Sequence, residues 1–243
     1  MEFIITETYD QMSRAAADAI AAKVRSCPDC TLGLATGSTP IGTYACLVAD
    51  HKDGTLDFSD VTTFNLDEYA GLAPEHRQSY RYFMNDNLFD HVNIDKARTH
   101  VPNGANADAD AVCNGYEQAI WDNGGIDLQL LGLGHNGHIG FNEPADAFPV
   151  GTHAVQLTES TINANSRLFD SIDDVPRSAY TMGIGTIMGA REVLVVVSGA
   201  DKADIVAKAF CGPVVPQVPA SVLQLHPACT VICDAEAASK LPR

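Results

Sequence analysis

The stretch Ile126-Asp-Leu-Gln-Leu-Leu-Gly-Leu-Gly-His-Asn-Gly-His-Ile-Gly-Phe-Asn-Glu-Pro144 decides the fold of this chain of 243 residues. Its first seven residues form a mostly apolar run, which predicts a buried β-strand. The run ends in a segment where glycines alternate with polar side chains, as is typical of the loop that follows a strand in an α/β protein. The stretch therefore predicts a parallel sheet whose strands end in functional loops.

The same alternation of apolar runs and helix-like stretches extends in both directions from this segment. Strands are predicted at Phe3–Thr6, Thr31–Ala35, Val61–Asn65, Ile126–Gly132, Glu192–Val197 and Cys229–Cys233, and helices at Tyr9–Val24, Pro40–Asp50, Ser79–Leu88, Asp108–Asp122 and Asp201–Phe210. This order indicates a Rossmann-like α/β fold, with a mainly parallel sheet and helices on both faces. Because no linker or repeat interrupts the pattern, we expect residues 1–243 to form a single domain.

The charge of the chain limits its partners. It has 31 acidic and 15 basic side chains, which give a net charge of -16. Nucleic acids and anionic membranes require a basic surface, so we expect neither as a partner. No apolar run reaches membrane-spanning length, and the N-terminal residues do not resemble a signal segment. An acidic protein that binds an anionic substrate must concentrate positive charge locally, which makes the few Arg and Lys residues informative.

The seven cysteines predict buried free thiols in a reducing compartment, since their number is odd and several lie in apolar runs. Cys27-Pro-Asp-Cys30 has the C-x-x-C spacing of redox sites and of half a zinc site. No second half follows it, however, and Pro-Asp is typical of a turn. We therefore expect a cytoplasmic protein that has no metal site.

A second strand-to-helix turn lies at Gly33-Leu-Ala-Thr-Gly-Ser-Thr-Pro-Ile-Gly-Thr43. The free N–H groups of such a turn and the positive end of the helix dipole bind anions, and Pro40 suits the first helical turn. The Gly-Lys-[Ser/Thr] sequence of a Walker loop is missing, so a sugar phosphate fits better than a nucleoside triphosphate. An ordinary tight turn explains this stretch equally well when it is taken alone.

Two acidic residues, Asp67 and Glu68, follow the strand predicted at Val61–Asn65, within Phe64-Asn-Leu-Asp-Glu-Tyr69. A partly buried setting would tune either carboxylate as a general base. A helix cap or a solvated loop is the alternative for this pair.

The turn after Ile126–Gly132 contains two histidines, Asn136 and Glu143 within a few residues. Imidazole exchanges protons near neutral pH, and a neighbouring carboxylate can orient it. The same turn matches the dinucleotide pattern G-x-G-x-x-G, but the residues after it do not continue a helix, so we do not expect a nicotinamide site. Metal binding by His135 and His138 is an alternative, although their spacing matches no helix-borne pair such as H-E-x-x-H.

Two basic residues are candidates for binding a phosphate. Arg167 lies in Ala164-Asn-Ser-Arg-Leu-Phe169, and Lys202 follows the strand predicted at Glu192–Val197, near a helix start. A lysine at that end opposes the helix dipole unless it serves a ligand, and an arginine clamps a phosphate through its planar fork. Taken alone, a residue of either kind is more often an ordinary surface charge.

Taken together, these segments resemble the glucosamine-6-phosphate deaminase family along nearly the whole chain. The matching stretches are Leu34-Ala-Thr-Gly-Ser-Thr-Pro40, Phe64-Asn-Leu-Asp-Glu-Tyr69, Ser79-Tyr-Arg-Tyr-Phe-Met84, Gly137-His-Ile-Gly-Phe-Asn-Glu-Pro144, Ala164-Asn-Ser-Arg167 and Leu223-Gln-Leu-His-Pro227. The resemblance implies an aldose-ketose-isomerising deaminase of amino-sugar catabolism. Such an enzyme converts glucosamine 6-phosphate and water into fructose 6-phosphate and ammonia, without a metal or organic cofactor.

The resemblance also implies a role for each candidate residue. His138 would open the pyranose ring, supported by Glu143 and Asn136, and Asp67 would move a proton from C2 to C1. No role falls to His135. The phosphate would be held by Thr36, Gly37, Ser38, Thr39, Arg167 and Lys202.

Two departures from the family pattern refine this expectation. Some members carry aspartate where this chain has Asn136, and an amide can orient a partner but cannot take up a proton. Allosterically activated members bear basic residues after the Asn-Glu-Pro motif, whereas Ala145–Val155 contains no Arg or Lys. We therefore expect a monomer or small homo-oligomer that N-acetylglucosamine 6-phosphate does not activate, rather than an obligate allosteric hexamer.

Three other functions remain open at this point. A sugar-phosphate lactonase of similar fold would release no ammonia. A deaminase for the galactosamine epimer would use the same residues. A non-catalytic sugar-phosphate sensor would need no general base, and the presence of Asp67, His138 and Glu143 argues against it.

Overall fold

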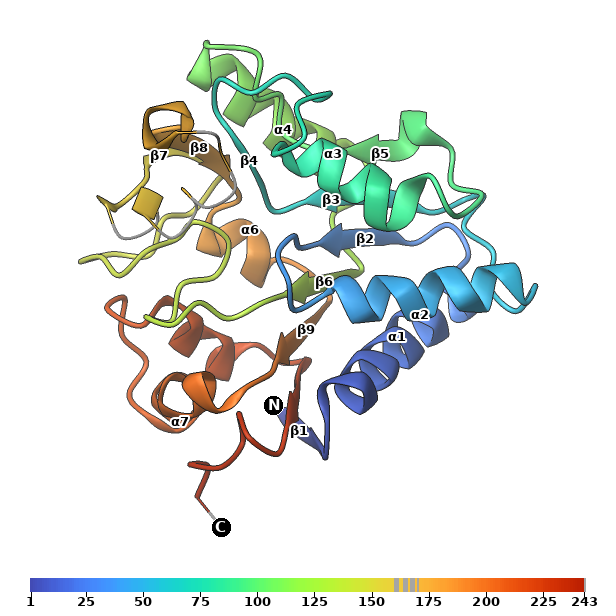
Figure 1. The fold of residues 1–243 in the computed structure, drawn as a ribbon, viewed down its shortest axis with the longest axis vertical. Coiled ribbons are helices and arrows are strands. Elements are labelled where there is room, and N and C mark those ends of the chain that lie inside the picture. The colour runs from blue at the N-terminus through green and yellow to red at the C-terminus, as the bar shows by residue number, and fades with distance from the viewer. Residues whose placement is uncertain (160–161, 164–165, 167–168, 170, 243) are drawn as a thin grey trace.

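The computed structural model describes residues 1–159, 162–163, 166, 169 and 171–242, which form two sheets and the helices around them (Figure 1). The main sheet has seven strands, and every neighbouring pair in it runs parallel. In spatial order they are β1 (Glu2–Thr6), β10 (Cys229–Asp234), β9 (Glu192–Val197), β6 (Leu128–Leu131), β2 (Thr31–Leu34), β3 (Thr62–Asn65) and β5 (Thr99–His100).

The helices cover both faces of this sheet. They are α1 (Tyr9–Ser26), α2 (Ile41–Lys52), α3 (Tyr80–Met84), α4 (Ala109–Asp122), α6 (Ile184–Met188) and α7 (Ala203–Cys211). A π-helical turn, Asn85–Phe89, continues α3, and 3-10 turns lie at Lys96–Arg98, Ile172–Asp174, Ala200–Lys202 and Pro219–Leu225. The connections from β1 to β2 and from β2 to β3 each place the next strand nearer the β5 edge of the sheet. The connections from β6 to β9 and from β9 to β10 each place the next strand nearer the β1 edge. Since parallel crossovers are right-handed, the two sets of helices lie on opposite faces, which confirms the predicted fold.

The α1 helix illustrates how the sequence forms and places these elements. The Thr8 side chain accepts a hydrogen bond from the N–H of Gln11 and so caps the first turn. Met12, Ala16 and Ile20 recur at helical spacing and are fully buried. This apolar stripe packs against β9 and β10, as the periodicity of the sequence predicts.

A smaller antiparallel sheet was not predicted. It consists of β4 (Asp67–Tyr69), β8 (Ser178–Thr181) and β7 (His153–Gln156), in that order. Its β4 strand begins two residues after β3 ends, at the edge where the parallel strands of the main sheet terminate. The stretch that contains Asp67 and Glu68 is therefore a strand rather than a loop, and the two side chains point to opposite faces of it.

A strand at the centre of the main sheet carries a polar side chain whose burial the apolar pattern of the sequence does not predict. Gln129 on β6 is fully buried and lies in register with Gly33 on β2. A Cβ atom on Gly33 would be 2.0 Å from Oε1 of Gln129, so the glutamine side chain occupies the space that the glycine leaves. Its Nε2 donates a hydrogen bond to the carbonyl of Leu130 at 2.9 Å.

Candidate active site

The candidate residues lie at the point in the main sheet where the order of the strands reverses. The β2 and β6 strands are neighbours, yet the connection after β2 leads toward one edge and the connection after β6 toward the other (Figure 1). In doubly wound α/β folds, ligands bind outside the carboxyl ends of the strands at such a switch point. The Thr36–Thr39 turn follows β2, the Gly132–Glu143 segment follows β6, and Lys202 follows the adjacent β9.

The turn after β6 is closed by its own backbone. The N–H of Gly134 donates to the carbonyl of His138 at 2.9 Å, and the N–H of Gly137 donates to the carbonyl of Gly134 at 3.0 Å. Gly137 has a φ of 89°, which favours glycine. The carbonyl of Gly137 accepts a hydrogen bond from the N–H of Ala220, which fixes the turn to the 3-10 segment before β10.

This turn brings three of the predicted catalytic residues together. The Nδ1 atom of His138 lies 3.4 Å from Oε1 of Glu143, and both side chains are partly buried. Nδ2 of Asn136 donates to Oε2 of Glu143 at 2.5 Å, while Oδ1 of Asn136 accepts from the N–H of His138 at 3.1 Å. Asn136 thus binds both partners and orients the carboxylate toward the imidazole. The arrangement supports acid-base chemistry by a histidine whose ring is held by a carboxylate.

Asp67 and Glu68, which the sequence treats as a pair, have separate environments. Glu68 accepts hydrogen bonds from three backbone N–H groups, those of Tyr69, Tyr80 and Arg81, at 2.8 to 3.0 Å. The last two belong to the first turn of α3, so Glu68 serves as a cap for that helix. Asp67 is 6% exposed, and burial raises its pKa to about 8, with a further contribution from the negative charge of Glu68. Asp67 is therefore the carboxylate with the properties of a general base.

Asp67 lies against the turn that holds His138. A Cβ atom on Gly140 would be 3.4 Å from Oδ2 of Asp67 and 2.8 Å from Oγ1 of Thr181. Thr181 pairs with Asp67 across β4 and β8, and its Oγ1 accepts a hydrogen bond from the N–H of Phe141 at 3.1 Å. Thr181 thereby joins the strand of the base to the histidine turn. The sequence analysis missed this residue, since no motif surrounds it.

The burial of Asp67 predicts a pH-dependent stability. The ordinary pKa of an aspartate is near 4, so between about pH 4 and pH 8 the unfolded chain carries an ionised Asp67 while the folded chain keeps it protonated. Folding then takes up a proton, and stability falls as pH rises. Relative to Asp67→Asn, the parent should lose about 1.4 kcal/mol of unfolding free energy per pH unit in this window.

Urea unfolding of both proteins at pH 5, 6 and 7 measures this difference. The variant Asp53→Asn changes an exposed carboxylate beyond α2 and serves as the control, which should follow the parent at each pH. If the unfolding free energies of the parent and Asp67→Asn changed equally with pH, Asp67 would be ionised in the folded protein at neutral pH.

The turn after β2 has the features of an anion site. Gly37 has a φ of 104°, and Gly37 and Ser38 are exposed. Within the described part of the chain, the N–H groups of Gly37, Ser38 and Thr39 donate to no other protein group. Tyr9 fixes this turn through its hydroxyl group. The hydroxyl donates to the carbonyl of Thr39 at 3.1 Å and accepts from the N–H of Gly42 at 2.9 Å. Backbone N–H groups in such a turn suit a phosphate.

Lys202 reaches the same edge of the sheet from the segment after β9. Its Nζ atom donates to the carbonyl of Leu133 at 2.7 Å, and partial burial lowers its pKa. This contact places a positive charge beside the β6 turn at the N-terminus of α7, where the helix dipole disfavours a cation. Arg167, the other predicted phosphate ligand, lies outside the described residues.

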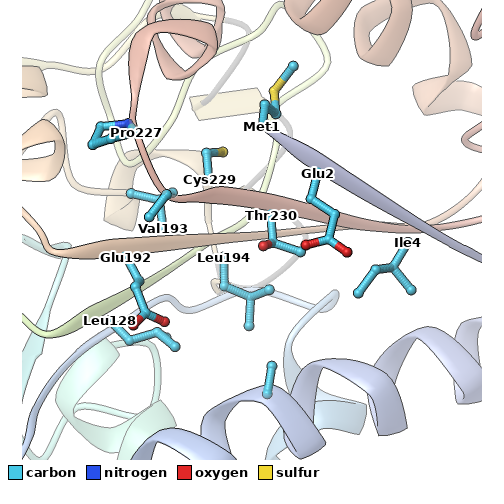
Figure 2. A pocket seen from close by; sticks show the side chains of 12 residues that line it. Met1, Glu2, Ile4, Leu128, Glu192, Val193, Leu194, Pro227, Cys229 and Thr230 are labelled. Atoms are coloured by element: carbon cyan, nitrogen blue, oxygen red, sulfur yellow. The ribbon is translucent and has the colours of Figure 1, made fainter.

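Two cavities elsewhere in the protein do not include these residues. Figure 2 shows a cavity of about 480 Å³ that is lined by Met1, Glu2, Glu192 and Cys229, among others. It lies where β6, β9 and β10 begin, at the edge opposite the carboxyl ends. A second cavity, of about 650 Å³, lies between α4 and α6 beside the exposed Trp121. Neither contains a candidate general base next to a histidine.

Among the residues that the structure describes, no group of three or more His, Cys, Asp or Glu side chains could hold a metal ion. No helix in the described ranges is both long enough and apolar enough to cross a membrane.

Comparison with known proteins places the chain in a family. A family model described as glucosamine-6-phosphate isomerases/6-phosphogluconolactonase matches residues 6–232. A curated glucosamine-6-phosphate deaminase from Lachnoclostridium phytofermentans is 57% identical over 233 residues, which cover 96% of this chain and 99% of the relative. One from Clostridium perfringens is 53% identical over 241 residues, covering 99% and 100% of the two chains.

Solved structures agree with the sequence relatives. A monomeric glucosamine-6-phosphate deaminase superposes with a TM-score of 0.95 at 46% identity, covering 99% of this chain and 100% of its own. A 6-phosphogluconolactonase from Trypanosoma brucei superposes with a TM-score of 0.78 at 20% identity, covering 99% and 98%, and shares the fold. With a model match over most of the chain and relatives above 50% identity, this chain belongs to the family of glucosamine-6-phosphate isomerases and 6-phosphogluconolactonases.

Proposed function

We propose that this chain is an aldose-ketose-isomerising deaminase that converts glucosamine 6-phosphate and water into fructose 6-phosphate and ammonia. The observation that carries the proposal is the buried Asp67 beside the turn that holds His138 and Glu143. The relatives above 50% identity bear the name of this activity along the full length of the chain. An isomerisation with loss of an amine requires a base that moves a proton between neighbouring carbons, and Asp67 has the required setting.

The first step that we propose is opening of the pyranose ring by His138. The imidazole takes the proton of the anomeric hydroxyl and returns a proton to the ring oxygen as the bond from C1 to that oxygen breaks. Glu143 holds the ring and stabilises its charged form, as the 3.4 Å distance to Nδ1 allows. Asn136 serves as a positioning residue, since its amide binds Glu143 and the backbone of His138 and cannot take up a proton itself.

The second step is the proton transfer by Asp67. Its carboxylate removes the proton from C2 of the open-chain aldose, the electron pair forms a double bond between C1 and C2, and the aldehyde oxygen takes a proton from the substrate's ammonium group to give an enol. Asp67 then returns its proton to C1, and the nitrogen lone pair forms a protonated ketimine at C2. Water adds to this ketimine, and ammonia leaves as the C2 ketone of fructose 6-phosphate forms. A raised pKa suits this role, because a base that must both accept and return a proton works best when its pKa is near the working pH.

The phosphate provides the binding energy that orients the reacting carbons. We assign it to the N–H groups and hydroxyls of Thr36–Thr39 and to Lys202, with Arg167 as a further ligand. Lys202 and Arg167 supply positive charge at this place in a chain whose net charge is -16. A phosphate at one end of the substrate would place C1 and C2 toward Asp67 at the carboxyl edge of β3.

A coupled assay for released ammonia tests this function. Glucosamine 6-phosphate should release ammonia in amounts equal to the fructose 6-phosphate formed. Galactosamine 6-phosphate in the same assay decides which epimer is preferred. Hydrolysis of 6-phosphogluconolactone without ammonia release from either hexosamine phosphate would instead identify a lactonase, and binding of the sugar phosphates without any turnover would identify a sensor.

The sequence also supports proposals for the domain organisation, the cellular location and the oligomeric state of the enzyme. We propose a single catalytic domain over residues 1–243 that works in amino-sugar (N-acetylglucosamine) catabolism in the cytoplasm. All seven cysteines are free, which suits a reducing compartment. The segment Ala145–Val155 has no Arg or Lys for an anionic effector, which supports a monomer or small homo-oligomer without allosteric activation. The similar monomeric deaminase supports the same view.

A further inference from the structure

His135 and its two neighbours form a cluster that the proposed mechanism does not use. Nε2 of His135 lies 2.6 Å from Oδ2 of Asp201, and Nδ1 of His135 lies 3.4 Å from Nζ of Lys202. Lys202 in turn binds the carbonyl of Leu133 at 2.7 Å. The histidine comes from the turn after β6, and its two partners come from the 3-10 segment before α7. Two loops of the candidate site are thus joined through this ring.

The two contacts determine where the proton of His135 lies. The hydrogen bond from His135 holds the pKa of Asp201 below its usual range, so the carboxylate is ionised and can only accept; Nε2 must therefore carry the hydrogen. The Lys202 ammonium can only donate, so Nδ1 must present its lone pair. The neutral ring with its hydrogen on Nε2 satisfies both contacts. A protonated ring would place a second N–H opposite the ammonium at 3.4 Å, which is repulsive.

We propose that His135 is a further ligand of the substrate phosphate and that it takes up one proton from solvent when the dianion binds. This inference rests on the proposed function, because it assigns Lys202 to the phosphate. A phosphate oxygen that accepts from the third N–H group of Lys202 would lie beside Nδ1 of His135, because the two nitrogen atoms are 3.4 Å apart. The dianion cancels the repulsion between the two cations, so Nδ1 accepts a proton and donates it to the same anion. Asp201 stabilises the resulting imidazolium through Nε2.

The other charged groups around His135 are already paired. On its own turn, His138 faces Glu143 at 3.4 Å. On the first turn of α7, Asp204 pairs with Lys240 at 2.6 Å. Asp201 and Lys202 are accordingly the charges that face the His135 ring. Since imidazole exchanges its proton in the neutral pH range, the binding of a dianion by this cluster should depend on pH there.

Calorimetric titration with sulfate tests this proposal, because sulfate remains a dianion from pH 6 to pH 8 whereas a phosphate ester does not. Titrations at pH 7 in Tris and in PIPES, whose ionisation enthalpies differ, give the number of protons taken up per sulfate bound. The parent should take up part of a proton, and its sulfate Kd should be about tenfold lower at pH 6 than at pH 8. His135→Gln should lose most of both effects.

Two further variants make the test specific. Asp201→Asn keeps an acceptor for Nε2 but removes the charge that stabilises the imidazolium, so proton uptake should fall without loss of the fold. His91→Gln replaces an exposed histidine distant from the site and should behave as the parent. Equal proton uptake by the parent and His135→Gln, or no sulfate binding by the parent, would overturn the proposal. Ammonia release is measured separately, so a parent that couples sulfate to His135 without deaminating would refute the proposed function alone.

Discussion

Replacing Asp67 by asparagine should lower the turnover number for ammonia release by about 10³-fold, the size expected for loss of a general base. The amide has nearly the shape of the protonated carboxyl group, so the buried site between β4 and the histidine turn should be kept. It cannot accept the C2 proton, and the neighbouring Glu68 cannot replace it, because the carboxylate of Glu68 is held by three N–H groups of the chain. The effect should appear in kcat, with KM nearly unchanged.

The pH dependence of the parent provides an independent check. Because the pKa of Asp67 is about 8 and the base must be ionised, kcat/KM should rise with pH up to about 8. The exposed-site variant Asp53→Asn should retain the parent rate and profile. A rate for Asp67→Asn within a few-fold of the parent would remove Asp67 from the mechanism, whereas a lower rate together with a lower thermal stability would indicate a damaged fold instead.

The sequence predicted six of the seven strands of the main sheet and the position of its functional loops, and it missed only the two-residue edge strand β5 among these seven. Each predicted strand corresponds to one of the parallel strands. The clearest is β9, which is a nearly continuous apolar run because it is buried on both faces of the sheet. Glycine and polar residues directly after such a run place a loop at the carboxyl edge, and the structure has both predicted turns there. The contacts of Asn136 with Glu143 and His138 are local, so spacing along the chain was informative.

The sequence did not predict the pairing of strands that lie far apart along the chain. The β4 strand has three residues, two of them acidic, and pairs with β8 through contacts far along the chain. No alternation of apolar and polar residues marks so short a strand. The different roles of Asp67 and Glu68 follow from this pairing, because one side chain faces the histidine turn and the other faces α3. The burial of Gln129 likewise depends on Gly33 in a neighbouring strand, and neither residue alone predicts it.

Replacing Gly134 by alanine should lower kcat by about 10²-fold, the loss expected when a catalytic group is displaced by about 1 Å. A Cβ atom at Gly134 would lie 2.3 to 2.4 Å from three atoms of the His138 ring, far inside van der Waals contact. The ring must therefore move away from the position in which Glu143 holds it. Gly134 does not have a positive φ, so alanine fits its backbone and the effect is on the histidine.

A double-mutant cycle separates this displacement from a general loss of stability. In a His138→Ala background the ring is absent, so adding Gly134→Ala should change kcat no further. Gly115 on α4 is exposed, and a Cβ atom there would meet no neighbour, so Gly115→Ala is the matched control and should keep full activity. If Gly134→Ala lowered kcat equally in both backgrounds, the glycine would act on the substrate directly rather than through His138. If it kept the parent rate, the His138 ring would have to work from a different position than the one it occupies beside Glu143.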